Sequence, residues 1–158
     1  MHIAVVKGSI RDCASYAELE TSSGYDAYIE PYSTQEHLAE RCKPGVLYLN
    51  IIDTQSDGQL GFACLVYSAA RQTVELRRIV VKTPNQGIGQ LAMVAIEDYV
   101  ITYLPATRLW LDVLVDNSRA ISVYHKAGFQ PVESRVTPLG EVFIFEKQIG
   151  VQNQCHHG

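Results

Sequence analysis

Three strand-like segments follow one another closely in the middle of this chain. Residues 46–53, 60–68 and 72–82 are rich in branched and aromatic side chains, and a turn cluster separates the first two. Only a few residues connect each segment to the next. Connections this short join antiparallel strands, since parallel strands need a long crossover. The chain is therefore predicted to contain an antiparallel meander.

A glycine loop and an amphipathic helix follow the meander. The apolar residues of 87–103 share one helical stripe, and Pro105 comes just after it. Residues 108–115 are a further strand, so the helix is a crossover that makes this strand a parallel neighbour, or near neighbour, of 72–82. A short helix at 118–127, closed by Gly128, and a hairpin of 132–135 with 141–147 complete the pattern. The predicted fold is mixed α/β (α+β), with a mostly antiparallel central sheet flanked by helices.

The pattern before the meander is weaker. Residues 3–6 are a candidate strand, and 10–19 have weak helical spacing. Ser33 and Glu36 form a capping-box pattern, which predicts a helix from there to about Cys42. No repeat or linker divides the chain. We therefore expect one domain over 1–149 and a polar tail at 150–158.

Composition narrows the class of protein. The net charge of −4 argues against a general nucleic-acid binder. No run approaches the roughly 20 apolar residues of a membrane span, and no export signal is visible. The cysteines have no metal-ligand spacing and are expected to be reduced, with Cys64 in the core; they are Cys13, Cys42, Cys64 and Cys155. We expect a cytoplasmic protein without a metal site.

The glycine loop lies between a strand and a helix. Its residues are Asn85, Gln86, Gly87, Ile88, Gly89 and Gln90. A helix start offers unpaired N–H groups and partial positive charge, and two glycines let the backbone approach a phosphate. A tight turn that only admits the helix is the alternative. The loop lacks the third glycine of a dinucleotide fingerprint and the Gly-Lys-Ser/Thr of a P-loop.

A second motif follows at the short helix. Its residues are Asn117, Ala120, Tyr124, Gly128 and Phe129. With both motifs in this order, the chain resembles the GNAT superfamily of acyl-CoA-dependent N-acetyltransferases. In the family's loop motif, Gln/Arg-x-x-Gly-x-Gly/Ala, the glycines fall on Gly87 and Gly89. The Gln/Arg position falls on Pro84, whose side chain cannot bind phosphate.

The resemblance implies acetyl-CoA as co-substrate and a primary amine, on a small molecule or a peptide, as acceptor. Ile79, Val80 and Val81 would pair with the pantetheine arm at a splayed strand edge, and residues 85–90 would cradle the pyrophosphate. Asn117 would hold the pantetheine end, and Tyr124 would protonate the thiolate of CoA. The resemblance also allows a homodimer.

Tyr124 and Glu75 are the candidate catalytic residues. Tyr124 lies two helical turns after Asn117, and a phenol can donate a proton at pH 7. The alternative is a half-buried helix tyrosine. Strand alternation places Glu75 on one face with Arg77, Ile79 and Val81. Glu75 is either the base that deprotonates the amine or an ion-pair partner of an arginine, and ordered water could replace it as base.

Other polar residues receive weaker assignments. Asp112 either lines the acceptor cleft or pairs with an arginine, and the pairing is the favoured interpretation. His125 is expected at the surface. A cationic amine would suit an acceptor wall formed by Tyr25, Asp26, Tyr28, Glu30 and Tyr32, although ordinary packing also explains these residues.

Two functions from other classes stay open at this point. The first is a non-catalytic acyl-CoA-binding or regulatory module on the same fold, which Pro84 and the uncertain base suggest. The second is an interaction domain without a ligand, in which Gly87 and Gly89 serve only a turn.

Overall fold

The computed structural model describes residues 2–22, 30–83 and 87–150. The predicted helices and strands are present, with ends that differ by at most three residues from the expected ones. The elements are β1 (Ile3–Lys7), η1 (Ile10–Asp12), α1 (Cys13–Ser22), α2 (Thr34–Arg41), β2 (Val46–Asp53), β3 (Gln59–Ser68), β4 (Thr73–Val81), α3 (Ile88–Tyr103), β5 (Arg108–Leu114), α4 (Ser118–Lys126), β6 (Gln130–Thr137) and β7 (Gly140–Gln148).

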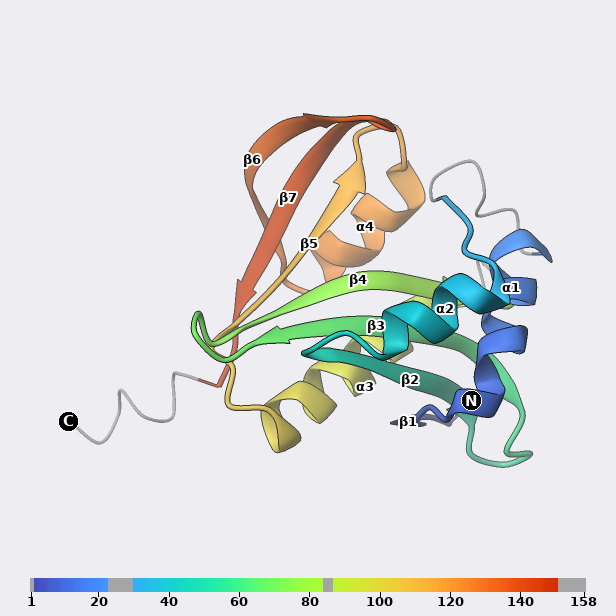
Figure 1. The fold of residues 1–158 in the computed structure, drawn as a ribbon. Coiled ribbons are helices and arrows are strands. Elements are labelled where there is room, and N and C mark those ends of the chain that lie inside the picture. The colour runs from blue at the N-terminus through green and yellow to red at the C-terminus, as the bar shows by residue number, and fades with distance from the viewer. Residues whose placement is uncertain (1, 23–29, 84–86, 151–158) are drawn as a thin grey trace.

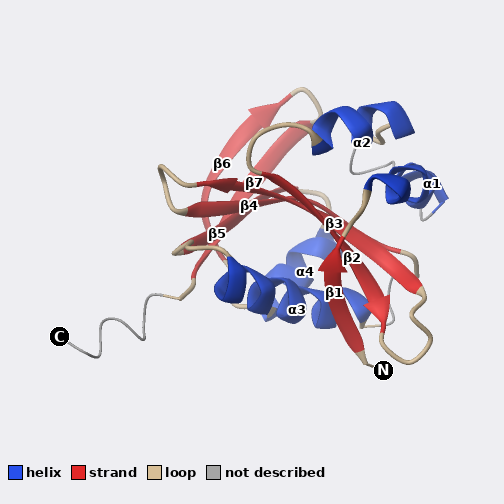
Figure 2. Cartoon of the chain, turned by 60° about the horizontal axis from the view of Figure 1, so that its bottom comes forward, coloured by secondary structure: helices blue, strands red, loops and turns tan. Residues whose placement is uncertain are grey.

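A single seven-stranded sheet organises the fold, with the order β1-β2-β3-β4-β5-β7-β6. All neighbouring strands are antiparallel except β4 and β5, which are parallel as the crossover predicts. Helices α1 and α2 cover one face of the sheet, and α3 and α4 cover the other (Figures 1 and 2). The predicted fold class is confirmed. Within the described residues, no helix is long and apolar enough to cross a membrane.

Strands β4 and β5 separate soon after they begin. They pair only where Thr73–Glu75 meets Arg108–Trp110. Beyond that point β4 stays with β3, and β5 stays with β7, so the two halves of the sheet diverge (Figure 1). The facing edges of β4 and β5 therefore have no strand between them, and the predicted splay is present.

A β-bulge at Arg77 changes which face each β4 side chain occupies. Cys64 of β3 pairs with Arg78, but Leu65 pairs with Leu76, so Arg77 is an extra residue. Leu76 and Ile79 consequently both pack in the core beneath α3 and α4, although their spacing is odd. Arg77 instead bonds Glu40 of α2 on the opposite face. The prediction that Glu75 and Arg77 share a face with Ile79 and Val81 is wrong, because simple alternation ignores the bulge.

Three apolar clusters hold the helices to the sheet. The smallest lies at the start of α3 and consists of Ile51, Val81, Ile88 and Ala92, and the other two lie on opposite faces of the sheet. The larger one joins the sheet to α3 and α4 and includes Leu76, Met93, Leu111 and Phe145. The smaller one lies beneath α1 and α2 and is formed by Cys13, Tyr16, Leu19, Tyr48, Phe62, Cys64 and Val80. Cys64 is thus a core residue, as predicted. Cys155 lies outside the described residues.

Candidate active site

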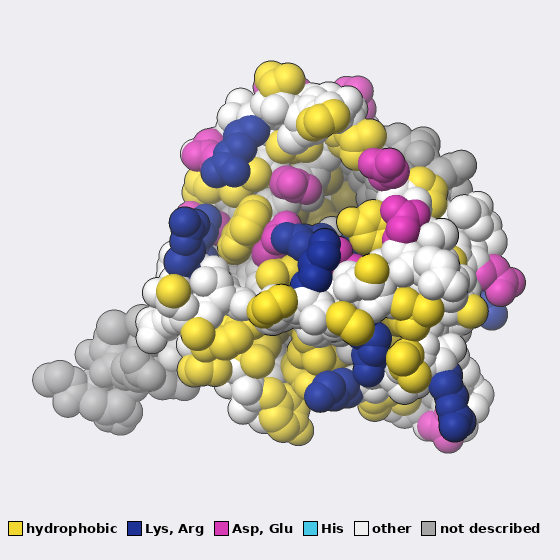
Figure 3. Space-filling view, in the orientation of Figure 1, with side chains coloured by type: hydrophobic (Ala, Val, Ile, Leu, Met, Phe, Trp, Pro, Cys, Tyr) yellow, Lys and Arg dark blue, Asp and Glu magenta, His cyan; other side chains and the backbone are white. Residues whose placement is uncertain are grey.

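A cleft of about 1010 Å³ lies where β4 and β5 diverge. Its walls come from those two strands, the start of α3, one side of α4, the turn between β6 and β7, and the segment before α2. Figure 3 shows the molecule hollowed between the hairpin and β4, with acidic and basic side chains on the walls. The volume lies at the upper end of the range for ligand sites, which is room for a large cofactor and a second substrate.

Helix α3 opens onto this cleft at its N-terminus. Its N-cap is Gly87, with φ of +75°, a conformation that favours glycine. A methyl group at Gly87 would meet no atom within 4 Å, and one at Gly89 would meet only Val123 at 3.9 Å. Protein packing therefore does not require these glycines to be small. They leave the first amide groups of α3 accessible from the cleft, which suits an anion. Pro84, Asn85 and Gln86 lie outside the described residues.

The β4 edge supplies backbone groups to the same cleft. Ile79 and Val81 are among the lining residues. The side chain of Val80 points to the cluster beneath α1, so Val80 can contribute only its backbone. Residues 76–81 pair with β3 on one side and have no β5 partner on the other. Their outward backbone groups can pair with an extended ligand, as an added strand would.

Helix α4 brings the second motif into the cleft. Asn117 is its N-cap, and the side-chain Oδ1 accepts a hydrogen bond of 3.3 Å from the Ala120 amide. Tyr124 is buried, with its ring centroid 6.1 Å from that of Phe129 and 6.3 Å from that of Phe145. Both Asn117 and Tyr124 line the cleft, so the predicted common face of the helix is present.

Two basic residues of α4 also line the cleft and were missed by the sequence analysis. Arg119 and Lys126 are seven residues apart, hence on one side of the helix. That spacing within the second motif was the available signal. Gln90 lies beside them, and its Nε2 donates to the carbonyl of Val123 at 3.3 Å, which links α3 to α4. The α3 and α4 side of the cleft is therefore basic and rich in N–H groups.

Glu75 does not line the cleft. Its carboxylate accepts a hydrogen bond of 2.8 Å from Arg77, which also binds Glu40 of α2 at 3.0 Å. The structure thus contains the ion pair that was one of the two interpretations of Glu75. To act as the base, Glu75 would have to reach the acceptor amine through Arg77 or through a water molecule.

Asp112 lies in the cleft, on the face of β5 opposite to Leu111 and Val113. No described side chain forms an ion pair with it, so the favoured interpretation, pairing with an arginine, is not what the structure contains. Desolvation by the surrounding cleft walls raises the pKa of the Asp112 carboxyl even though its side chain is still exposed to solvent, and the charges of Arg77 and Arg135 oppose that rise. His125 is exposed, as expected.

Only two residues of the predicted acceptor wall lie in the described part of the chain. Glu30 and Tyr32 line the cleft, while Tyr25, Asp26 and Tyr28 lie outside the described residues. The guanidinium of Arg78 lies 3.5 Å from the centroid of the Tyr32 ring, a cation–π contact. Arg78 also donates to the carbonyl of Glu30 at 3.0 Å. Arg78 therefore fixes this wall to β4.

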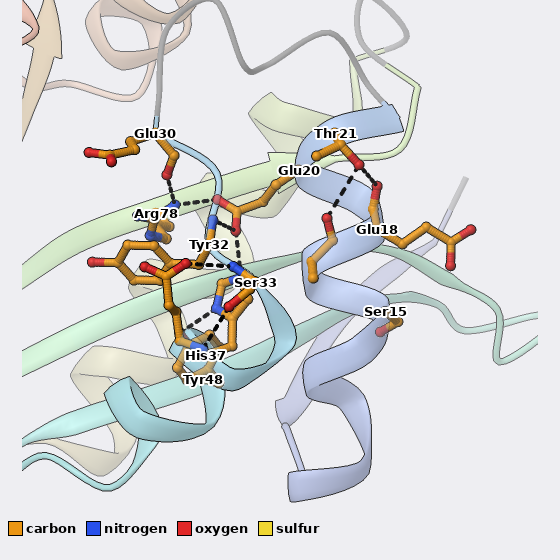
Figure 4. Close-up of polar contacts among 12 residues, drawn as sticks. Ser15, Glu18, Glu20, Thr21, Glu30, Tyr32, Ser33, His37, Tyr48 and Arg78 are labelled. Atoms are coloured by element: carbon orange, nitrogen blue, oxygen red, sulfur yellow. Dashed lines mark hydrogen bonds and ion pairs between the residues drawn. The ribbon is translucent and has the colours of Figure 1, made fainter.

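A buried polar network holds Arg78 in turn. Glu20 of α1 accepts hydrogen bonds from Arg78 and from the Tyr32 amide, and its carboxylate contacts His37 of α2 (Figure 4). The other ring nitrogen of His37 lies 2.7 Å from the hydroxyl of Tyr48. Glu20 and His37 are fully buried. Polar groups buried in this way are held by one another, so the network supports the segment that carries Glu30 and Tyr32.

The sequence and the fold were compared with known proteins. The model of the acetyltransferase (GNAT) family matches residues 13–129. No curated protein sequence matches the chain significantly.

Solved structures with the same fold cover nearly the whole chain. The aminoglycoside acetyltransferase AAC(6')-Ib in complex with coenzyme A and kanamycin superposes with a TM-score of 0.81 at 14% identity, over 98% of this chain and 99% of that one. The spermidine N-acetyltransferase from Vibrio cholerae in complex with CoA and spermine gives a TM-score of 0.79 at 18% identity, over 92% and 95%. A GNAT-family acetyltransferase from Streptococcus pneumoniae gives 0.74 at 18% identity, over 94% and 100%.

Proposed function

This chain belongs to the acetyltransferase (GNAT) family, and from that premise we propose that it transfers the acetyl group of acetyl-CoA to the primary amine of a small cationic acceptor. One observation carries the proposal. An open helix start, an unpaired strand edge and a buried tyrosine line one continuous cleft. Free thiols at Cys13, Cys42 and Cys64 support a cytoplasmic location.

The cofactor would bind on the α3 and α4 side of the cleft. Backbone N–H groups at Gly87 and Gly89, with the predicted Asn85 and Gln86, receive the pyrophosphate. Arg119 and Lys126 add the positive charge that the missing Gln/Arg at Pro84 does not supply. The pantetheine arm then runs along residues 79–81 of β4, and Asn117 marks its end.

The chemistry follows from that placement. A neutral amine attacks the thioester carbonyl and forms a new C–N bond, and backbone N–H groups of β4 stabilise the oxyanion. The tetrahedral intermediate collapses with cleavage of the C–S bond. Tyr124 donates its proton to the departing sulfur, and the nitrogen loses a proton to a base or to water. The products are an amide and CoA.

Asp112 and Glu75 are the two candidates for the group that receives the amine's proton. Asp112 faces the cleft from β5, and the raised pKa makes its carboxylate a stronger base than an ordinary aspartate. Glu75 is the sequence-based candidate, but Arg77 occupies its carboxylate. We therefore favour Asp112 as the group that binds and deprotonates the amine.

Charge supports a cationic acceptor. Both arginines at the acceptor side are already paired, Arg77 with Glu40 and Glu75, and Arg78 with Glu20. The carboxylates of Asp112 and Glu30 form no ion pair with any residue in the described part of the chain, and both line the cleft. The acceptor side therefore carries excess negative charge. Kanamycin and spermine, bound by the similar structures, are also amines.

Acetyl-CoA is expected to raise the Tm of the protein by several degrees. Ligand at about 100 times its Kd adds about 2.7 kcal/mol to the free energy of unfolding. The measurement is thermal unfolding with acetyl-CoA, and NAD and ATP serve as controls. Gly87→Ala should show a smaller shift, because its methyl group projects into the open space at the helix start.

A rise in Tm with acetyl-CoA, followed by release of CoA when amines are added, supports the proposed acetyltransferase activity. The amine panel should include polyamines, aminoglycosides and peptides. A shift without CoA release for any amine would replace the proposal with a binding module, and no shift at all would replace it with an interaction domain.

Asp112→Asn is expected to lower kcat/KM by roughly 10²-fold or more, with removal of the acidic limb of its pH profile. The raised pKa of Asp112 means that the folded protein favours the protonated carboxyl. The stability that Asp112 contributes is therefore present below the ordinary carboxyl pKa and is lost as pH rises through the folded-state pKa. At neutral pH the variant should thus be at least as stable as the wild type. The measurements are pH–rate profiles and thermal unfolding for Asp112→Asn and Glu75→Gln. A large loss confined to Glu75→Gln would assign the base to Glu75 instead.

A further inference from the structure

One end of the cleft is apolar. Its lining there comes from Leu114 of β5, Val142 of β7, and Pro138 and Leu139 of the turn between β6 and β7, which together form an apolar wall. Leu114 follows Asp112 by two residues on a regularly paired strand, so the two side chains share a face, about 7 Å apart along the strand. Val142 is the register partner of Leu114 and lies on that face as well. The apolar wall therefore begins beside the carboxylate proposed to bind the amine.

This apolar surface lies outside the core of the protein. None of the three apolar clusters of the described chain includes Leu114, Leu139 or Val142. Leu139 is 58% exposed, and hydrophobic side chains border the hollow between the hairpin and β4 (Figure 3). Apolar surface that lines a concave site is covered when a ligand with an apolar part binds there. The apolar wall can therefore receive an apolar group of the acceptor.

The charges near Asp112 favour a single ammonium group. Desolvation raises the pKa of the Asp112 carboxyl, and the positive charges of Arg77 and Arg135 are near enough to oppose that rise. These two charges would repel a second ammonium in the same region. On the apolar wall, a second ammonium would also lose its hydration without gaining a partner. The carboxylate of Glu30 belongs to the other side of the cleft, where Arg78 of β4 binds the Glu30 carbonyl.

We propose that the acceptor is an amphiphilic monoamine, with its one ammonium group at Asp112 and an alkyl or aromatic body on the apolar wall. This inference rests on the proposed acetyltransferase function, and it narrows the acceptor from cationic amines in general to one class. Burial of the body would hold the nitrogen beside the thioester. Contacts remote from the reacting atoms would thus contribute to kcat/KM.

The dependence on chain length tests the apolar contact. With saturating acetyl-CoA, CoA release is measured for straight-chain primary amines from propylamine to octylamine, for phenethylamine, and for the α,ω-diamine of each chain length. For the wild type we expect kcat/KM to rise about threefold with each methylene group until the apolar wall is covered. Each longer diamine should fall at least about tenfold below the monoamine of the same length, because its second ammonium would lie on the apolar wall.

A carboxylate on the apolar wall should reverse this preference. In Leu139→Asp, kcat/KM for octylamine should fall at least about tenfold, whereas kcat/KM for the diamine of the same length should rise, since its second ammonium then has a partner. Val136→Asp is the matched control and should keep the wild-type preference, because Val136 is 88% exposed on β6 and is not among the described residues that line the cleft. The Tm shift with acetyl-CoA should be equal in all three proteins, which checks that each is folded with an intact cofactor site.

The outcomes separate this inference from the proposed function. A wild-type preference for diamines, or a kcat/KM that does not depend on chain length, would overturn the inference and leave the acetyltransferase proposal in place. Equal changes in Leu139→Asp and Val136→Asp would also overturn it, since the effect would then be one of added charge alone. Absence of CoA release with every amine would instead overturn the acetyltransferase proposal, and this inference with it.

Discussion

Replacement of Tyr124 by phenylalanine is expected to lower kcat by about 10²- to 10⁴-fold, with little change in the KM for acetyl-CoA. The substitution removes one oxygen from a buried ring whose packing against Phe129 and Phe145 is otherwise unchanged. In the proposed binding mode, the pantetheine and phosphate contacts lie elsewhere in the cleft. The lost interaction is therefore one that acts when the C–S bond breaks. Steady-state kinetics with the best acceptor amine gives the measurement.

A change of leaving group separates proton donation from packing. When the thiol of an acetyl thioester is more acidic than that of CoA, its thiolate can leave without being protonated by an acid. Tyr124→Phe should then lose much less activity than it does with acetyl-CoA. Tyr103→Phe is the matched control, since that tyrosine is on α3 and 67% exposed. An equal loss with both thioesters, or full turnover with acetyl-CoA, would remove Tyr124 from the role of acid.

Local signals were sufficient for most of the fold. Short connections predicted the β2-β3-β4 meander, and the long crossover predicted that β5 is parallel to β4. The motif spacing predicted that Asn117 and Tyr124 share one side of α4. These features depend on residues close together in sequence, so periodicity and turn chemistry report them.

The features that were missed depend on partners far away in sequence. The bulge at Arg77 exists only in the pairing of β4 with β3, so no pattern within β4 alone identifies it. Glu20, His37 and Arg78 meet through tertiary packing. A local hint was available for Glu20, which follows Tyr16 and Leu19 on the buried side of α1. A carboxylate on an apolar stripe indicates a buried partner.

Glu20→Gln is expected to cause a large loss of stability. Glu20 is fully buried, and the side chain of Arg78 is only 9% exposed, so removal of the carboxylate charge leaves a buried guanidinium without its counter-ion. Breaking such a pair costs about 3–5 kcal/mol, since the desolvated charge that remains has no compensation. For a domain of this size that corresponds to a fall in Tm of roughly 6 to 20 °C. Chemical denaturation at neutral pH measures the free energy of unfolding.

Glu18→Gln is the matched control, because Glu18 lies on the same helix with its side chain in solvent (Figure 4). Its effect should stay within about 0.5 kcal/mol. The same network predicts a functional difference between the two variants. Arg78 holds Glu30 and Tyr32 at the cleft, so Glu20→Gln should raise the KM for the acceptor amine more than the KM for acetyl-CoA. Equal stability of the two variants would mean that water or a rearranged side chain compensates Arg78, and the acceptor wall would then owe its position to apolar packing alone.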